Sequence, residues 1–205
     1  GRTIKSRYST PNRVDKIKEP IQSIFWIMKD DALPPLVKIT DPRLASILGC
    51  TLMTKRSTAE NTGAGANLDA LVIEPYANPF RVYPLVEDYE KFKALFDKGV
   101  DCYIINTGDY LGKKVTKEVS LGVIETVVDG KANFELFGGL PGMEYLPVEG
   151  YEVPDMNGEY AELIRDRMQF RLDYLKAFND ANPEHQIPQD ALESIKTIER
   201  FIDVL

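Results

Sequence analysis

The chain has 205 residues, of which 43% are hydrophobic and 28% charged, and its formal net charge is −7 at pH 7. These values are typical of a globular protein and exclude a disordered, collagen-like or disulfide-dense chain. The negative charge argues against a nucleic-acid-binding surface, and no stretch approaches the roughly 18 consecutive apolar residues of a membrane span. Two isolated cysteines and one histidine form no zinc motif. We therefore expect reduced thiols in a cytoplasmic protein.

The first predicted elements are a basic segment and a buried strand. Basic residues outnumber acidic ones over residues 1–19, which indicates either a solvated arm or a segment that lines an anion site. Ser23 to Met28 is a β-branched and aromatic run, and it predicts a buried strand. Adjacent carboxylates on an extended chain point to opposite faces. We therefore expect Asp30 and Asp31 to form a solvated turn and not a cation site.

A short helix and a long polar segment are predicted next. The pattern from Asp41 to Leu48 predicts a helix that Asp41 caps and Gly49 ends. Residues 51–67 contain almost no large apolar side chain, which indicates a long loop that is either a functional lid or a disordered surface segment. Residues 68–74 then predict a second buried strand.

An α/β unit follows this strand. Apolar residues at helical spacing predict a helix over 86–98, and an apolar run predicts a strand over 100–105. After Asn106-Thr107-Gly108 we expect another helix, which Thr116 caps and whose buried stripe ends at Val128. This order of strand, helix, strand, turn and helix indicates an α/β fold.

The last part of the sequence is expected to be helical. Residues 134–154 are rich in glycine and proline and predict an irregular connection. Helices are predicted over 158–178 and 190–204. The expected fold is therefore a mixed sheet with flanking helices over residues 1–155, followed by a helical C-terminal cap over 156–205.

The strongest local chemistry lies between residues 106 and 120. A turn and a helix that begins near Thr116 place Lys113 and Lys114 beside a helix N-terminus, where charge and the helix dipole together stabilise a phosphate. This pattern indicates a nucleotide contact or, alternatively, two solvated lysines. The sequence has no GxxxxGK[ST] phosphate loop. Because its one histidine, His185, falls in a predicted surface loop, no Ser-His-Asp triad can be built.

Several short motifs occur in a characteristic order. They are the run from Ile24 to Pro35, Leu48-Gly49-Cys50-Thr51, Ala77-Asn78-Pro79-Phe80, the run from Tyr103 to Gly108, and Gly112-Lys113-Lys114. In this order and approximate spacing they resemble the C-terminal part of ATP-dependent phosphoenolpyruvate carboxykinase. The resemblance covers roughly residues 1 to 130, and it depends on the combination because each motif alone has low specificity.

The resemblance implies an enzyme that converts oxaloacetate and ATP to phosphoenolpyruvate, carbon dioxide and ADP with magnesium and manganese. Lys114, next to Lys113, stands where the family has an arginine that packs on adenine. Val115 and Ser120 stand at two further nucleotide-binding positions of the family. Arg2 corresponds to the arginine that reaches the transferred phosphate and the substrate, so the resemblance implies a catalytic role for it.

The sequence departs from the family pattern at several of these positions. Lysine replaces the adenine-packing arginine at Lys114, which loses planar stacking and retains the charge. Asp109 stands where the family usually has a tryptophan. The resemblance implies that residues 51–67 are the active-site lid, but Thr58-Ala59-Glu60 only partly matches the family's lid sequence Ala-Gly-Thr-Glu.

The resemblance also implies that a catalytic half is missing. The family's phosphate loop and metal ligands precede the segment that matches Arg2, so this chain would supply the adenine-side wall and the lid and hold no metal. Its partner would be the N-terminal part of the same enzyme, and we expect the chain alone to be inactive. Two alternatives remain open. One is a stand-alone nucleotide-binding or regulatory module, and the other is an interaction scaffold built on the two C-terminal helices.

Overall fold

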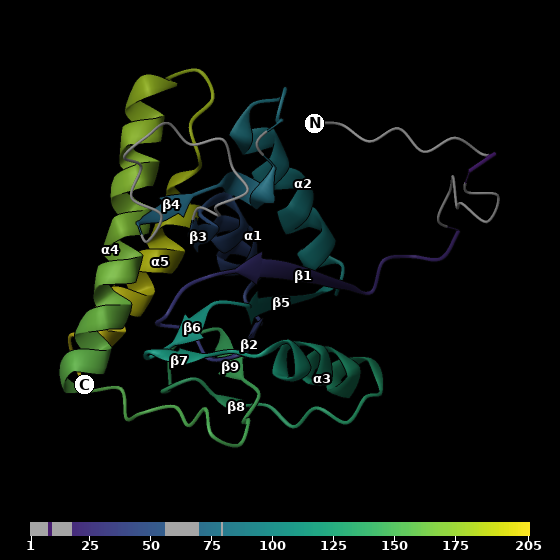
Figure 1. Cartoon of the computed structure of the whole chain (residues 1–205). Coiled ribbons are helices and arrows are strands. Elements are labelled where there is room, and N and C mark those ends of the chain that lie inside the picture. Colours follow the sequence, from purple (N-terminus) through teal and green to yellow (C-terminus); the bar gives the residue numbers. More distant parts are fainter. Residues whose placement is uncertain (1–7, 10–17, 56–69, 79) are drawn as a thin grey trace, which may run out of the picture.

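The computed structural model describes residues 8–9, 18–55, 70–78 and 80–205. Its centre is a five-stranded mixed sheet in the order β1-β5-β2-β9-β8 (Figure 1). The strands of this sheet are β1 (Ser23–Met28), β2 (Leu36–Ile39), β5 (Asp101–Asn106), β8 (Glu135–Leu136) and β9 (Met143–Tyr145). Strands β1 and β5 are parallel, and their last residues lie opposite each other. The other neighbours in the sheet are antiparallel.

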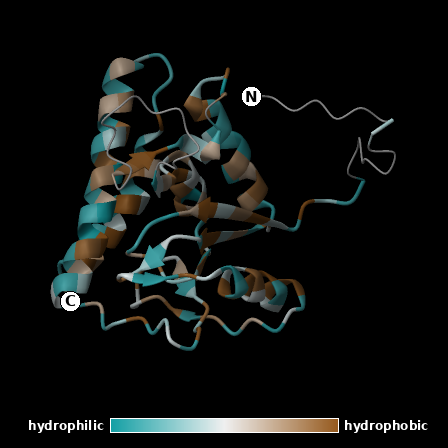
Figure 2. Cartoon of the chain, viewed as in Figure 1, coloured by the Kyte–Doolittle hydropathy of each residue, from teal (hydrophilic) through white to brown (hydrophobic). Residues whose placement is uncertain are grey.

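Helices cover both faces of the sheet (Figure 1). They are α1 (Pro42–Cys50), α2 (Leu85–Asp97), α3 (Lys117–Val128), α4 (Gly158–Ala181) and α5 (Gln189–Ile202). Cys102 and Ile104 of β5 belong to the large cluster with α1, α2, α4 and α5, whereas Tyr103 and Ile105 belong to a smaller cluster with α3. This alternation follows from the pleat of the strand. Figure 2 shows hydrophobic residues concentrated in these strands and helices.

Two short ribbons extend from this framework. Strand β3 (Met53–Lys55) pairs with β4 (Leu71–Ile73), and β6 (Asp109–Tyr110) pairs with β7 (Lys113–Lys114). A single 3₁₀ turn, Pro75–Ala77, follows β4. None of the helices in the described part of the chain combines the length and apolar character needed to cross a membrane.

The structure confirms a mixed α/β fold with flanking helices and a C-terminal helical segment. The predicted helix caps are also confirmed. Asp41 Oδ1 accepts hydrogen bonds of 2.9 Å from the amides of Arg43 and Leu44, and the Thr116 side chain accepts one from the amide of Val119. Both helices therefore begin where a capping side chain satisfies a free backbone amide.

The predicted end of the first helix is wrong. Gly49 lies inside α1, which continues to Cys50. A Cβ atom at Gly49 would lie 2.5 Å from the ring of Tyr76 and 3.2 Å from the ring of Trp26. The glycine therefore permits close packing of an aromatic side chain on the helix, and it does not stop the helix.

The sheet includes strands that the sequence pattern does not predict. Strand β2 begins immediately after Pro34-Pro35, and β8 and β9 lie within residues 134–154, which were expected to be irregular. These strands have two to four residues. Such short strands give no clear periodicity beside glycine and proline.

The region around the predicted lid also differs from the prediction. Within the polar loop expected over 51–67, Met53–Lys55 forms a strand; residues 56–67, which make up the rest of the predicted lid, lie outside the described part of the chain. Of the buried strand expected over 68–74, the described residues 70–74 contain a strand at Leu71–Ile73, which is half-buried because its partner is the ribbon strand β3 and not the main sheet.

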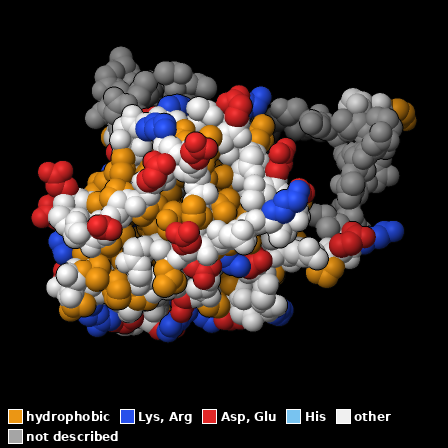
Figure 3. Space-filling view, turned by 90° about the horizontal axis from the view of Figure 1, so that it is seen from below, with side chains coloured by type: hydrophobic (Ala, Val, Ile, Leu, Met, Phe, Trp, Pro, Cys, Tyr) orange, Lys and Arg blue, Asp and Glu red, His pale blue; other side chains and the backbone are white. Residues whose placement is uncertain are grey.

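The C-terminal ends of α3 and α5 differ from the prediction. Val128, expected on the buried stripe of α3, is 73% exposed, and Val123 is the buried residue of that helix. The last helix ends at Ile202, before the exposed Val204. Figure 3 shows that hydrophobic side chains are also common on the face seen from below.

Candidate functional site

Strands β1 and β5 end side by side, and the turns that follow them form the candidate site. Met28 pairs with Asn106 at the carboxyl end of both strands. In α/β proteins, ligands bind beyond the carboxyl ends of parallel strands, where the connecting loops diverge. The segments at this edge are residues 29–35 and the loop and hairpin over 107–114.

A buried asparagine joins these two segments. Asn106 Nδ2 lies 2.8 Å from the carbonyl oxygen of Asp30, 2.6 Å from that of Leu33 and 2.9 Å from that of Asp109. Its Oδ1 accepts a hydrogen bond of 2.9 Å from the amide of Gly108. Because backbone groups occupy both ends of the amide, Asn106 fixes the shape of the site and is not free to bind a ligand.

The Asp30–Asp31 turn is bound by arginines, so the prediction of a solvated turn is wrong. Arg167 donates from Nε to Asp30 Oδ1 at 3.0 Å and from a terminal nitrogen to Asp31 Oδ1 at 2.7 Å. Arg171, which is 1% exposed, lies 3.7 Å from Asp30 Oδ2. Asp30 is also 1% exposed. Both arginines come from α4, so these ion pairs connect the helix to the sheet edge.

Burial and charge act in opposite directions on these arginines. Burial lowers the pKa of Arg171 to about 10, against the attraction of Asp30. Burial also acts to lower the pKa of Arg167, but attraction and hydrogen bonds from Asp30 and Asp31 outweigh it and raise that pKa. Both side chains therefore remain cations at neutral pH and neutralise the two carboxylates.

Helix α4 makes a further contact with this edge through two tyrosines. The Tyr160 hydroxyl donates to the carbonyl oxygen of Ala32 at 3.0 Å and accepts a hydrogen bond from Tyr110 at 3.3 Å. Burial raises the pKa of Tyr160 far above its usual range, so its hydroxyl stays protonated. The turn after β1 and the β6–β7 hairpin are thus held by the same helix.

A hollow of about 450 Å³ lies beside the Asp30–Asp31 turn. Its walls come from the turn, from the β3–β4 ribbon and from α4. The residues that line it are Asp31, Lys55, Leu71, Asp166, Arg167 and Phe170. Among the described residues that line it, two acidic and two basic side chains cancel in formal charge.

The residues predicted to bind nucleotide lie in and after the β6–β7 hairpin. Lys113 and Lys114 form β7 and are exposed, whereas Val115 is buried. The half-buried Ser120 lies in the first turn of α3, and its hydroxyl donates to the carbonyl oxygen of Thr116 at 3.0 Å. The structure therefore places the two lysines directly before the N-terminus of α3. The predicted catalytic residue Arg2 lies outside the described residues.

The cysteines and the histidine offer no nucleophile or metal site. Burial raises the pKa of Cys50 and of Cys102 to about 12, so both thiols remain protonated at neutral pH. His185 is exposed in the turn between α4 and α5, as predicted. Within the described ranges, no three His, Cys, Asp or Glu side chains are grouped as metal ligands. In the turn after β1, Asp30 and Asp31 are paired with arginines and do not fit a metal ion.

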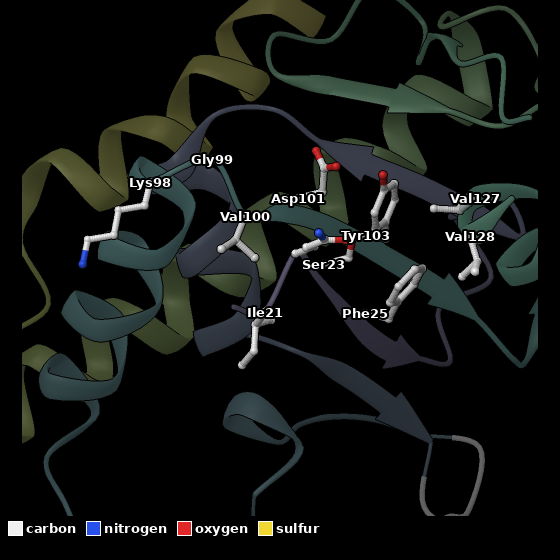
Figure 4. Close-up of a pocket in the computed structure, with 11 residues that line it drawn as sticks. Ile21, Ser23, Phe25, Lys98, Gly99, Val100, Asp101, Tyr103, Val127 and Val128 are labelled. Atoms are coloured by element: carbon white, nitrogen blue, oxygen red, sulfur yellow. The ribbon is translucent and has the colours of Figure 1, made fainter. Parts of the chain in front are cut away.

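A second hollow, of about 610 Å³, lies at the opposite, amino ends of β1 and β5 (Figure 4). Two of its lining side chains make contacts within the protein: Asp101 forms an ion pair of 3.1 Å with Lys38, and the ring of Tyr103 stacks on Phe25 with centroids 4.8 Å apart. Burial raises the pKa of Tyr103 to about 12. The presence of Asp101 and Tyr103 at this hollow is thus explained by contacts within the protein. The hollow contains none of the predicted site residues.

Arg167, Arg171 and Tyr160 are the residues that the sequence prediction misses. Arg171 could have been found, because it falls at helical spacing between Met168 and Leu175 on a stripe that is otherwise apolar. A charged residue on such a stripe indicates a buried partner. Comparison with known proteins adds no assignment: no family model matches the chain, and no curated protein is significantly similar to it.

Proposed function

We propose that this chain is the C-terminal part of an ATP-dependent phosphoenolpyruvate carboxykinase and supplies the adenine-side wall of its active site. The observation that carries the proposal is the position of the motifs. The turn before Leu33-Pro34-Pro35 is distant in sequence from the Asn106-Thr107-Gly108 turn and the pair Lys113-Lys114, but all three follow the carboxyl ends of β1 and β5. This is the edge at which α/β proteins bind nucleotides.

The contacts at this edge support a binding role for the chain. Phosphoryl transfer requires positioning and charge neutralisation more than a protein nucleophile. Lys114 offers an exposed cation beside the N-terminus of α3, where charge and dipole both favour a phosphate. In this proposal the magnesium and manganese ions would be held by the N-terminal part of the enzyme, because Asp30 and Asp31 are paired with arginines. The lid predicted over residues 51–67 remains part of the proposal.

The proposal includes a reducing compartment. Cys50 and Cys102 are free and buried, and protonated buried thiols are compatible with the cytoplasm. Oxaloacetate, phosphoenolpyruvate and the adenine nucleotide would be the small-molecule ligands of the complete enzyme, and its N-terminal part would be the protein partner of this chain.

Two measurements test this function. Translation of the DNA upstream of Gly1 should reveal a GxxxxGK[ST] phosphate loop with an acidic metal ligand shortly after it; an immediate start codon would support the stand-alone nucleotide-binding module instead. The purified 205-residue chain should bind magnesium-ATP in a calorimetric titration, with loss of affinity in Lys114→Ala. It should not convert oxaloacetate and ATP to phosphoenolpyruvate, and turnover by this chain would refute the assignment of the catalytic centre to a missing part.

A further inference from the structure

The two lysines of β7 lie on opposite faces of the hairpin. The antiparallel register pairs Tyr110 with Lys113 and Asp109 with Lys114. Successive strand residues point to opposite sides. Tyr110 is buried against α4. Because Lys113 is paired with Tyr110, the Lys113 side chain leaves the backbone on the face of the hairpin that is turned toward the protein. The side chains of Lys114 and Asp109 leave the backbone on the opposite, solvent-facing side. The ammonium groups of Lys113 and Lys114 therefore have different surroundings.

The ammonium group of Lys113 is already engaged by the protein. Its Nζ donates to the carbonyl oxygen of Gly150 at 2.5 Å and lies 4.6 Å from the centre of the Tyr151 ring. Backbone amides and, to a smaller degree, the charge of Lys113 lower the pKa of Glu152. A carbonyl oxygen, an aromatic face and a carboxylate therefore all stabilise this cation.

The same segment also holds the backbone at Lys114. The Tyr151 hydroxyl donates to the carbonyl oxygen of Lys114 at 2.6 Å. Gly150 has φ of +78°, and a Cβ atom there would lie 2.7 Å from Lys113 Nζ. The positive φ favours glycine at this position, and a larger residue would displace the end of the Lys113 side chain. Residues 150–151 consequently fix β7 at both of its positions.

Lys114 has none of these side-chain contacts. Its side chain is exposed, and in the described part of the chain its ammonium group has no hydrogen bond, ion pair or aromatic partner. It can therefore bind a phosphate or pack against a base without first breaking a contact within the protein. For Lys113, the same step would require loss of the bond to Gly150.

We propose that Lys113 is a positioning residue that fixes β7 through Gly150 and Tyr151 and does not itself contact the nucleotide, so that this contact is left to Lys114. This inference rests on the proposed nucleotide site. It assigns different roles to two adjacent residues of identical chemistry.

Trace acetylation of the 205-residue chain with acetic anhydride, read at each lysine by mass spectrometry, tests the positioning role without a ligand. Lys114 should react several-fold faster than Lys113. Gly150→Ala should raise the rate at Lys113, because the added methyl displaces its ammonium group. Gly130→Ala is the matched control: Gly130 also has positive φ, of +68°, but no atom lies within 4 Å of its Cβ position. Equal rates at the two lysines of the unmodified chain would overturn the positioning role.

Repeating the acetylation with saturating magnesium-ATP tests the nucleotide role separately. The rate at Lys114 should fall, whereas the rate at Lys113 should not change. Protection of Lys113 by ATP would overturn the inference even if Lys114 is protected. If neither lysine is protected while Lys113 still reacts slowly, the nucleotide role and the proposed function fail, and the positioning contacts remain valid.

Affinity measurements distinguish positioning from direct binding. Lys114→Met should weaken ATP binding roughly tenfold or more, which is the effect of losing one charge-assisted hydrogen bond. Lys113→Met should weaken it less, and Lys113→Arg should restore it, because a guanidinium can also donate to Gly150 and stack on Tyr151. A Lys113→Arg variant as weak as Lys113→Met would overturn the positioning role.

Discussion

Replacement of Asp30 by alanine should strongly destabilise the protein. Asp30 accepts hydrogen bonds from Arg167 at 3.0 Å and from the amide of Ala32 at 3.1 Å, and it lies 3.7 Å from Arg171. Without this carboxylate, Arg171 would be a fully buried cation with no opposite charge in contact among the described residues. Breaking a buried ion pair from one side reduces the free energy of unfolding by about 3–5 kcal/mol.

We expect a loss of about 4 kcal/mol for Asp30→Ala, which would be a large part of the roughly 5–15 kcal/mol that stabilises a typical domain. Arg171→Met should reduce the free energy of unfolding by only about 1 kcal/mol, because the buried cation is removed and Asp30 keeps Arg167 and Ala32 as partners. The contrast between these two variants isolates the effect of an unpaired buried charge.

Urea titration followed by the fluorescence of Trp26, the one tryptophan of the chain, measures these differences. Lys131→Ala is the control, because it breaks an ion pair with Asp129 whose side chains are 73% and 54% exposed; it should change the free energy of unfolding by less than about 1 kcal/mol. If Asp30→Ala were no more destabilising than Lys131→Ala, the reasoning from burial would be refuted.

Three further predictions concern other elements. Although burial opposes it, hydrogen bonds from the first-turn backbone hold the pKa of Asp41 below its ordinary value, so its stabilising effect should be lost as pH falls through that lowered pKa. In Asp41→Asn the free energy of unfolding should decrease less as the pH is lowered into the acid range, and a decrease equal to that of the unmodified chain would contradict this. Gly49→Ala should lower the free energy of unfolding by about 1–3 kcal/mol through its clash with Tyr76; a urea midpoint equal to that of the unmodified chain would exclude the clash. Cys50 and Cys102 should react with a thiol-specific disulfide reagent only after denaturation, and rapid labelling of the native chain would contradict their burial.

The sequence predicts those elements whose pattern is local. The centres of β1 and β5 are short runs of isoleucine and aromatic residues, and the apolar spacing of α2 is sustained over 13 residues. The caps Asp41 and Thr116 are also recognised within a few positions of their helices. Strand β2, in contrast, is four residues long and follows two prolines, so its identity depends on the neighbouring strands β5 and β9.

The candidate site is less predictable because its contacts are distant in sequence. The local sequence predicts a solvated turn at Asp30 and Asp31, and only the folded structure shows that Arg167 of α4 is paired with both carboxylates. Similarly, the Lys113-Lys114 pair has no visible asymmetry in the sequence. Their different surroundings arise from a strand only two residues long and from its contacts with Gly150 and Tyr151.

The ion pair between Asp30 and Arg167 also has a consequence for biosynthesis. The two residues are 137 positions apart, so a ribosome that has released β1 must still produce most of the chain before α4 can reach it. Until then the carboxylate at the end of β1 remains hydrated, and the turn cannot take its final buried form. Completion of this edge is therefore a late, non-local event. A nascent chain arrested before α4 would contain the lysine hairpin without the helix that anchors it.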